Sequence, residues 1–116
     1  MKRIKWSIEE VVAIADLYFR YEGGEINNLT LDLERLSQVL KRRADILGIV
    51  HDEKFRNLNG MQCIFENIKY VATDGEKGLS NASKLHQQII DMYYNDRELF
   101  NEILDNFRQK YFDYPP

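Results

Sequence analysis

The sequence predicts an all-α protein, a compact bundle of about five helices that forms one domain over residues 1–116. Apolar side chains recur at helical spacing in successive segments, and no segment alternates as a long β-strand would. The stretches between these segments are short and contain the residues that favour turns. A chain of 116 residues, 44% hydrophobic and 30% charged, also has the length and composition of an ordinary globular domain.

The first helix is expected to begin after Ser7. The Ser7 hydroxyl and the Glu10 carboxylate have the spacing of a capping box, in which each side chain bonds a free backbone amide of the other residue. An apolar stripe follows, formed by Ile8, Val11, Val12, Ala15, Tyr18 and Phe19. Further apolar residues widen this stripe, which predicts burial on more than one side. Gly23 and Gly24 are expected to end the helix.

A second helix is predicted near residues 30–43, with an inner face formed by Leu33, Leu36, Val39 and Leu40. Residues 44–56 carry a weaker pattern, and both a short helical turn and an extended piece are open there. Asn57 is the expected cap of a third helix, whose apolar residues continue to Val71. Residues 73–80 are rich in turn-forming residues and are expected to form a loop.

The fourth helix is expected from about Ser83 to Tyr94. Asn95 and Glu98 have the spacing of a second capping box, which predicts a fifth helix that continues to Tyr111. Three aromatic residues fall off the inner stripes and are the candidates for a docking surface, namely Tyr94, Phe112 and Tyr114.

A net charge of −3 and a pI near 5.4 argue against a broadly basic nucleic-acid-binding protein. The basic residues that could contact nucleic acid must therefore form a local patch. A single cysteine excludes an intramolecular disulfide bond and suits a reducing compartment. No signal peptide or membrane-spanning segment is recognisable, so a cytoplasmic protein is expected.

No set of residues predicts catalysis, a metal site or another cofactor. His51 and His86 lack further histidines at metal-ligand spacing, and Cys63, beside apolar residues, is expected to be a small buried residue. The Asp-x-Lys triplet at 52–54 is interpreted as a solvated loop, because metal-dependent nucleases place such a triplet on a strand. No small-molecule substrate is evident.

The candidates for DNA contact are seven cationic or amide side chains: Arg42, Arg43, Arg56, Asn57, Asn59, Lys77 and Lys84. Arginine and lysine contact DNA phosphates, and an asparagine at a helix N-terminus adds a donor where the helix dipole attracts anions. Composition alone favours a second interpretation, in which Arg42 and Arg43 only cap one helix and Asn57 only caps another.

Three groups of residues resemble motifs of one helical family. They are Trp6-Ser7-x-Glu9-Glu10 followed by Ala13-x-Ala15-Asp16-Leu17-Tyr18-Phe19-Arg20, then Phe55-Arg56-Asn57-x-Asn59-Gly60, then Lys77-Gly78-Leu79-Ser80 with Lys84. Over roughly residues 5–95, the chain resembles the N-terminal head domain of McrA-like, modification-dependent HNH restriction endonucleases. Leu58 stands where that family often has proline, and residues 45–50 lack the family's proline-bearing turn.

The resemblance implies a module attached to a DNA-restriction protein of antiviral defence. It implies DNA contact first at Arg56, Asn57 and Asn59, and next at Lys77 and Lys84, whereas Arg42 and Arg43 are chosen on charge alone. The chain has no His-Asn-His constellation and no domain that reads a modified base, so nuclease activity is not expected of it.

We therefore expect a non-catalytic, DNA-associated module, with DNA, a second copy or neighbouring domains as partners. The alternative is a protein-interaction module, either a dimerisation domain or a small regulator or inhibitor. The acidic second half of the chain and its aromatic C-terminal residues favour this alternative.

Overall fold

A computed structural model describes residues 3–80 and 82–112 of the chain. It contains five helices, α1 (Ile8–Glu22), α2 (Leu29–Ile46), α3 (Leu58–Ala72), α4 (Lys84–Asn95) and α5 (Arg97–Tyr111). The described residues form no β-strand. The prediction of an all-α bundle of about five helices is confirmed.

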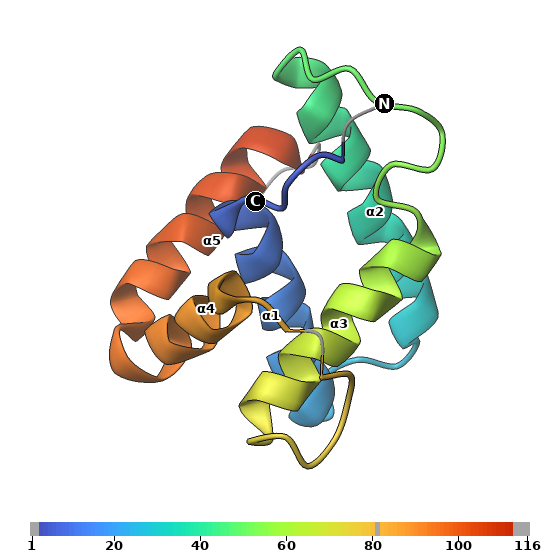
Figure 1. Cartoon of the computed structure of the whole chain (residues 1–116). Helices are drawn as coiled ribbons and strands as arrows, with labels where there is room; N and C mark the ends of the chain where they lie inside the picture. The colour runs from blue at the N-terminus through green and yellow to red at the C-terminus, as the bar shows by residue number, and fades with distance from the viewer. Residues whose placement is uncertain (1–2, 81, 113–116) are drawn as a thin grey trace.

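Helix α1 lies at the centre of the bundle and packs against each of the other four helices (Figure 1). The α2–α3 pair lies on one side of it and the α4–α5 pair on the other. The width of its apolar stripe explains this position, because Val11, Val12, Ile14 and Ala15 are all fully buried. A helix that is apolar on several faces is stable only where neighbours cover those faces.

The predicted caps of α1 and α3 are confirmed. The Glu10 amide donates to Ser7 Oγ at 3.3 Å, and the Ser7 amide donates to Glu10 Oε1 at 3.0 Å. At α3, the Gly60 amide donates to Asn57 Oδ1 at 2.9 Å. Each cap satisfies an amide that the first helical turn leaves without a partner.

The predicted capping box of Asn95 and Glu98 is wrong. Asn95 is the last residue of α4, and Asp96 caps α5, with its Oδ1 accepting from the Leu99 amide at 3.2 Å. A carboxylate accepts a charge-assisted bond and also complements the positive end of the helix dipole. The adjacent aspartate can therefore replace asparagine in this role.

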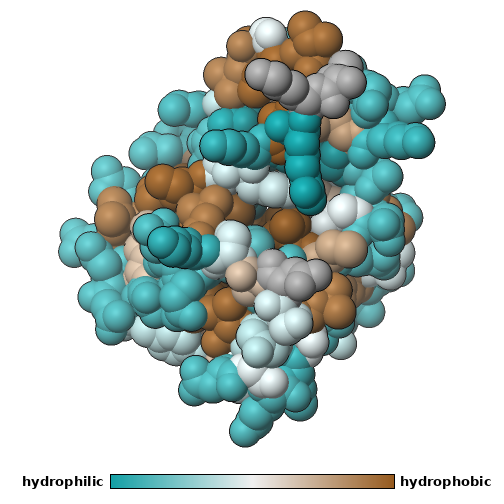
Figure 2. Space-filling model, viewed as in Figure 1, coloured by the Kyte–Doolittle hydropathy of each residue, from teal (hydrophilic) through white to brown (hydrophobic). Residues whose placement is uncertain are grey.

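The segment left open by the sequence begins as helix, because α2 continues three residues beyond Arg43. Gly48 then adopts a φ of +72°, which redirects the chain. Beside this turn, Ile46, Leu47 and Val50 are 60%, 49% and 80% exposed, and we call these three residues the apolar tip. Figure 2 shows hydrophobic surface at the corresponding upper end of the molecule.

The predicted loop at residues 73–80 is confirmed, and it folds back onto α3. The Leu79 amide donates to the Glu66 carbonyl at 3.1 Å. Gly78 has a φ of +88°, and a side chain there would collide with the backbone of Glu66 and Tyr70. Glycine is therefore required by both the backbone conformation and the close approach of the loop.

Among the residues that the structure describes, no helix combines the length and the apolar character needed to cross a membrane.

Candidate functional site

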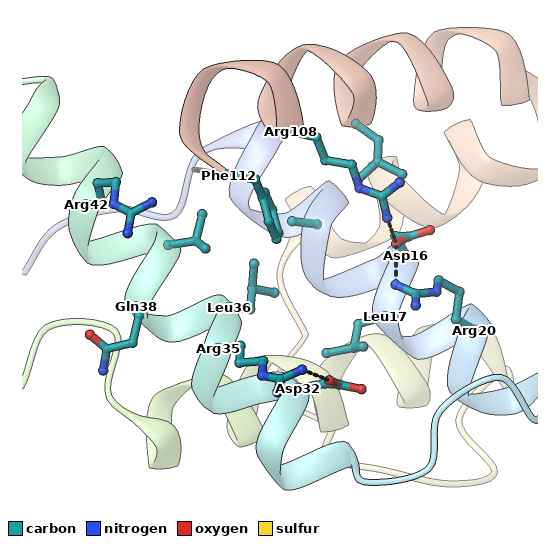
Figure 3. Close-up of a pocket in the computed structure, with 13 residues that line it drawn as sticks. Asp16, Leu17, Arg20, Asp32, Arg35, Leu36, Gln38, Arg42, Arg108 and Phe112 are labelled. Carbon is teal, nitrogen blue, oxygen red and sulfur yellow. Dashed lines mark hydrogen bonds and ion pairs between the residues drawn. The ribbon is translucent and has the colours of Figure 1, made fainter. Parts of the chain in front are cut away.

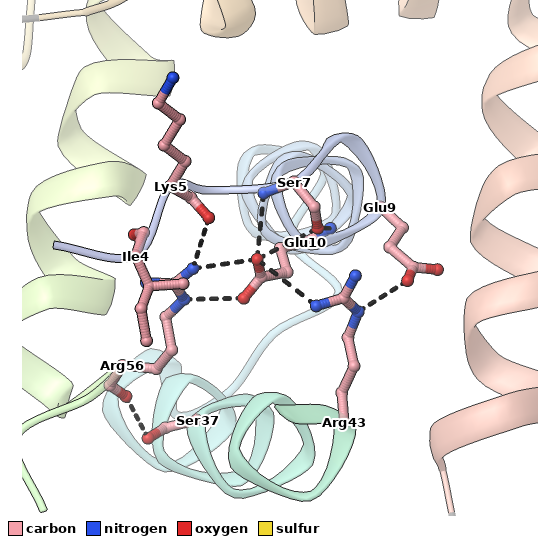
Figure 4. A network of polar contacts seen from close by, with 8 residues as sticks. All are labelled: Ile4, Lys5, Ser7, Glu9, Glu10, Ser37, Arg43 and Arg56. Atoms are coloured by element: carbon pink, nitrogen blue, oxygen red, sulfur yellow. Dashed lines mark hydrogen bonds and ion pairs between the residues drawn. The ribbon is translucent and has the colours of Figure 1, made fainter. Parts of the chain in front are cut away.

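Arg56, the first candidate for DNA contact, lies in a buried network of polar contacts rather than on the surface (Figure 4). Its Nε donates to Glu10 Oε2 at 2.7 Å and its Nη2 to Glu10 Oε1 at 3.0 Å, a two-point ion pair. The side chains of Arg56 and Glu10 are only 6% and 1% exposed. Such pairs have the geometric fit that makes arginine suited to buried carboxylates.

The remaining contacts of Arg56 also face inward. Its guanidinium donates to the carbonyls of Ile4 and Lys5 at 3.3 and 3.1 Å and lies 3.8 Å from the centre of the Trp6 ring. On the backbone, the Ser37 hydroxyl donates to the Arg56 carbonyl. In this structure Arg56 is therefore not available for contact with DNA, because its donors already bind groups of the fold.

Arg43 belongs to the same buried network. Its Nε donates to Glu9 Oε1 at 2.6 Å, its Nη1 lies 3.8 Å from Glu10 Oε1, and its side chain is 11% exposed. Arg43 therefore joins α2 to the start of α1, and its side chain is engaged within the fold.

The other predicted residues remain at or near the surface. Asn57 is half-buried and uses its side-chain oxygen to cap α3, whereas Asn59, Lys77 and Lys84 are exposed. Arg42 is exposed at the edge of a groove. The seven predicted residues therefore do not form one patch, because some of them are buried and others are exposed.

Two motifs on which the family resemblance rests meet in the buried network. Trp6 and Glu10 come from the first motif, Arg56 comes from the second, and Arg56 contacts both of them. The third motif contains Gly78, which lets its loop lie against α3. Trp6, Glu10, Arg56 and Gly78 of these motifs therefore maintain the fold, whereas Asn59, Lys77 and Lys84 of the same motifs remain exposed.

A groove of about 580 Å³ lies between α1, α2 and α5 (Figure 3). Four arginines from three helices line it, namely Arg20, Arg35, Arg42 and Arg108. Its floor is apolar and is formed by Ala13, Leu17, Leu36, Val39, Leu104 and Phe112. An apolar floor with a few converging charged groups is the usual composition of a ligand-binding pocket.

A second hollow adjoins the groove and shares Asp16, Arg20 and Arg108 with it. Arg97 enters it from α5, with its guanidinium 3.3 Å from the centre of the Tyr93 ring. The Tyr93 ring in turn stacks on Phe19 at 3.6 Å. We call the five arginines of the two hollows the arginine face, which consists of Arg20, Arg35, Arg42, Arg97 and Arg108.

The arginine face contains five of the eight arginines of the chain, and no described lysine lines either hollow. Arginine offers a planar fork of donors that fits phosphate or carboxylate in two-point geometry, and its plane also stacks on rings. The use of arginine rather than lysine therefore favours recognition of a planar or forked anion over nonspecific attraction of any anion.

Asp16 lies between two members of the arginine face. Its Oδ2 is 3.1 Å from Arg108 Nη2 and 3.6 Å from Arg20 Nη1. Burial raises the pKa of Asp16, and the two arginines lower it only in part. Asp16 therefore holds two arginines in place while it opposes the approach of another anion. Asp32 lies 4.0 Å from Arg35 in a looser contact.

The described residues contain no cluster of three or more His, Cys, Asp or Glu side chains that could hold a metal ion. The expectation that Cys63 is buried is wrong, because it lies on the exposed side of α3. His86 is buried, its Nδ1 accepts from the Ser83 amide at 2.8 Å, and desolvation lowers its pKa. His86 therefore serves the start of α4 in its neutral form.

Comparison with protein-family models, with curated proteins and with solved structures gave no match to this chain.

The sequence analysis missed four of the five arginines of this face, namely Arg20, Arg35, Arg97 and Arg108. One signal was present, since Arg35, Gln38 and Arg42 follow a spacing of three and then four residues, which aligns them on one side of α2. Nothing in the sequence indicates that Arg20 and Arg108 come together at Asp16, because they are far apart along the chain.

Proposed function

We propose that this chain is a non-catalytic, DNA-associated module that contacts the phosphate backbone through the arginine face. The observation that carries the proposal is the convergence of five arginines from three helices on two adjoining hollows. Among the residues that the structure describes, three carboxylates line the same hollows, those of Asp16, Asp32 and Glu25. This face is therefore positive in a chain whose net charge is −3.

The resemblance to McrA-like head domains supports a place in a restriction or defence protein of the cytoplasm. In this proposal the chain holds or orients a neighbouring domain on DNA, and that domain performs recognition and cleavage. The arginine face replaces Arg56 and Arg43 as the contact surface, because these two side chains bind carboxylates of the fold.

The test is fluorescence anisotropy with a labelled DNA duplex at several salt concentrations, between about 50 and 200 mM. Each phosphate contacted contributes about −0.9 to the slope of log affinity against log salt. With up to five arginines engaged, the expected slope is roughly −3 to −4.5. Unmodified and methylated duplexes should bind alike, because backbone contacts carry no sequence information. A phosphorothioated duplex should bind similarly, because the substituted phosphate keeps its negative charge.

A matched pair of double variants locates the surface. R35Q/R42Q removes two cations of the arginine face, and K77Q/K84Q removes two exposed cations elsewhere, with the same change in net charge. The first variant should reduce the salt slope by about 2 and the second should leave it unchanged. Loss of affinity only in the second variant would instead support the contacts implied by the family resemblance.

The apolar tip favours a second candidate function, self-association or docking to a neighbouring domain. Ile46, Leu47 and Val50 are exposed together next to a glycine turn, and clustered apolar surface often marks an interface. Light scattering would test it by comparing the chain with an I46S/V50S variant. A dimer that dissociates in the variant supports this candidate, and a monomer at high concentration contradicts self-association.

A further inference from the structure

The floor of the groove requires an explanation that phosphate contact does not provide. Ala13, Leu17, Leu36 and Val39 line it beneath the arginines, together with Leu104 and Phe112. A duplex presents its charged backbone at the surface and keeps its bases stacked inside, so it would leave this floor uncovered. The groove therefore fits a ligand with an apolar, flat part as well as an anionic part.

The size of the groove restricts the ligand further. Its volume of about 580 Å³ falls in the range of roughly 300–1,000 Å³ typical of sites for small ligands. A single nucleotide belongs to that size class of ligand.

From this floor and its arginine rim, we infer that the groove receives an unpaired nucleotide of a nucleic-acid strand, with the base on the floor and the phosphates at the arginines. This inference rests on the proposed function and names the form of nucleic acid that the same site prefers. Proteins that bind single strands commonly combine a positive groove with surfaces on which bases pack.

The rim is arranged for this ligand on both sides of the groove. Arg42 donates from Nη1 to the Tyr111 carbonyl at 3.2 Å, which fixes its guanidinium at one side and uses one of its five N–H donors. Arg108 is held by Asp16 at the other side, where the groove joins the second hollow. Phosphates on either side of a bound base can thus each meet an arginine.

The second hollow offers a place for the neighbouring nucleotide. There the guanidinium of Arg97 covers one face of Tyr93, whose ring lies on Phe19. A planar arginine layered on aromatic rings is a surface on which a further base can stack. The strand would then pass from the groove to the second hollow across Arg20 and Arg108, which line both.

The deciding experiment compares two labelled single strands of about 12 nucleotides, one of thymidylate and one of abasic residues with the same phosphates. Base packing predicts that the protein binds the thymidylate strand at least about tenfold more tightly than the abasic strand. The thymidylate strand should exceed a duplex of equal length by the same factor. Equal affinity for the two single strands overturns the inference and leaves the proposed DNA contact intact. No binding of any probe overturns both.

A variant pair tests the floor itself. V39A trims the floor of the groove, and V71A makes the same change on α3 outside it. V39A should weaken thymidylate binding several-fold without changing abasic binding, and V71A should change neither. Circular dichroism verifies that both variants are folded, and the comparison of the two strands does not depend on either variant.

Two competitors distinguish other occupants. An acidic peptide of alternating glutamate and leucine, or free ATP, is added to the complex with the thymidylate strand. The inference expects both to displace the strand only at concentrations far above that of the unlabelled strand. Stronger competition by the peptide would assign the groove to a protein segment, and stronger competition by ATP would assign it to a free nucleotide; either result overturns the inference.

Discussion

The buried network and the arginine face use the same side chain in opposite ways. In the network, Arg56 and Arg43 are enclosed and bind carboxylates of α1. On the arginine face, the side chains of Arg20, Arg35 and Arg108 are between 41% and 71% exposed. The N–H donors of an enclosed arginine bind acceptors within the protein, whereas an exposed arginine keeps N–H donors available for a ligand.

This difference also determines what a substitution measures. Removing a partner from an enclosed pair leaves an uncompensated charge in the protein interior, so the effect appears in stability. Removing an exposed arginine costs little stability because water solvates its partner, so an effect on binding can be observed separately. The same substitution in the two regions therefore tests the assignment of each.

The largest expected effect is the loss of stability in R56A. Glu10 would remain almost fully buried without its two-point partner, and breaking a buried pair typically costs about 3–5 kcal/mol. Urea denaturation monitored by circular dichroism measures the free energy of unfolding. R35A is the matched control, and it should change that free energy by less than about 0.5 kcal/mol.

Similar stabilities of R56A and R35A would contradict the comparison. Such a result would mean that Glu10 remains solvated when Arg56 is absent, and Arg56 would again become a candidate for DNA contact. A folded R56A that loses DNA affinity would support the same conclusion.

The helices were predictable from the sequence because their signals are local. The capping box of Ser7 and Glu10, the cap by Asn57 and the broad stripe of α1 each depend on residues within a few positions of one another. The prediction of helix caps failed where two neighbouring residues can both act as the cap. Asp96, rather than the predicted Asn95, caps α5.

The candidate site was much less predictable, because it depends on contacts between distant segments. Glu10 and Arg56 are 46 residues apart, and Asp16 and Arg108 are 92 residues apart. The sequence shows that each residue is charged, but it does not show which opposite charge folding brings to it. The burial of Arg56 and the convergence of Arg20 with Arg108 therefore required the tertiary structure.

An intermediate effect is expected from D16N, which should strengthen DNA binding. The substitution removes a negative charge between Arg20 and Arg108 and releases both for phosphate. At a few ångströms near the surface, such a like charge costs on the order of 1 kcal/mol, or about fivefold in affinity. Anisotropy with the labelled duplex measures it, with D74N in the exposed loop as the control of equal charge change.

The same residue predicts the pH dependence of binding. Burial already raises the pKa of Asp16, and a bound phosphate would raise it further. Binding would then be coupled to proton uptake, so the affinity of the wild-type chain rises as the pH falls through the pKa of Asp16. D16N should lack this part of the pH dependence. If D16N binds DNA more weakly than the wild type, Asp16 positions the arginines more than it opposes the phosphate.

The smallest expected effect concerns the half-buried His51 and its exposed partner Asp45, a surface counterpart of the buried network. Its Nε2 lies 2.8 Å from Asp45 Oδ1 and its Nδ1 lies 3.1 Å from the Asp52 carbonyl, so both nitrogens face acceptors. The hydrogen bond to the Asp52 backbone, followed by that to Asp45, raises the pKa of His51 above 6.5. The imidazolium can donate both bonds, whereas neutral histidine can donate only one.

Because the folded-state pKa is raised, the stabilisation by His51 is fully present below about pH 6.5 and is lost as the pH rises through the folded-state pKa. The stability difference between the wild type and H51Q should therefore be larger near pH 5.5 than near pH 8 in urea denaturation. His86 has its pKa shifted in the opposite direction, but it is present in both chains and cancels in the difference. A stability difference that does not change with pH would show that His51 does not pair with Asp45 in solution. Water would then compete successfully for this pair at the surface, as it cannot for the buried pair of Arg56 and Glu10.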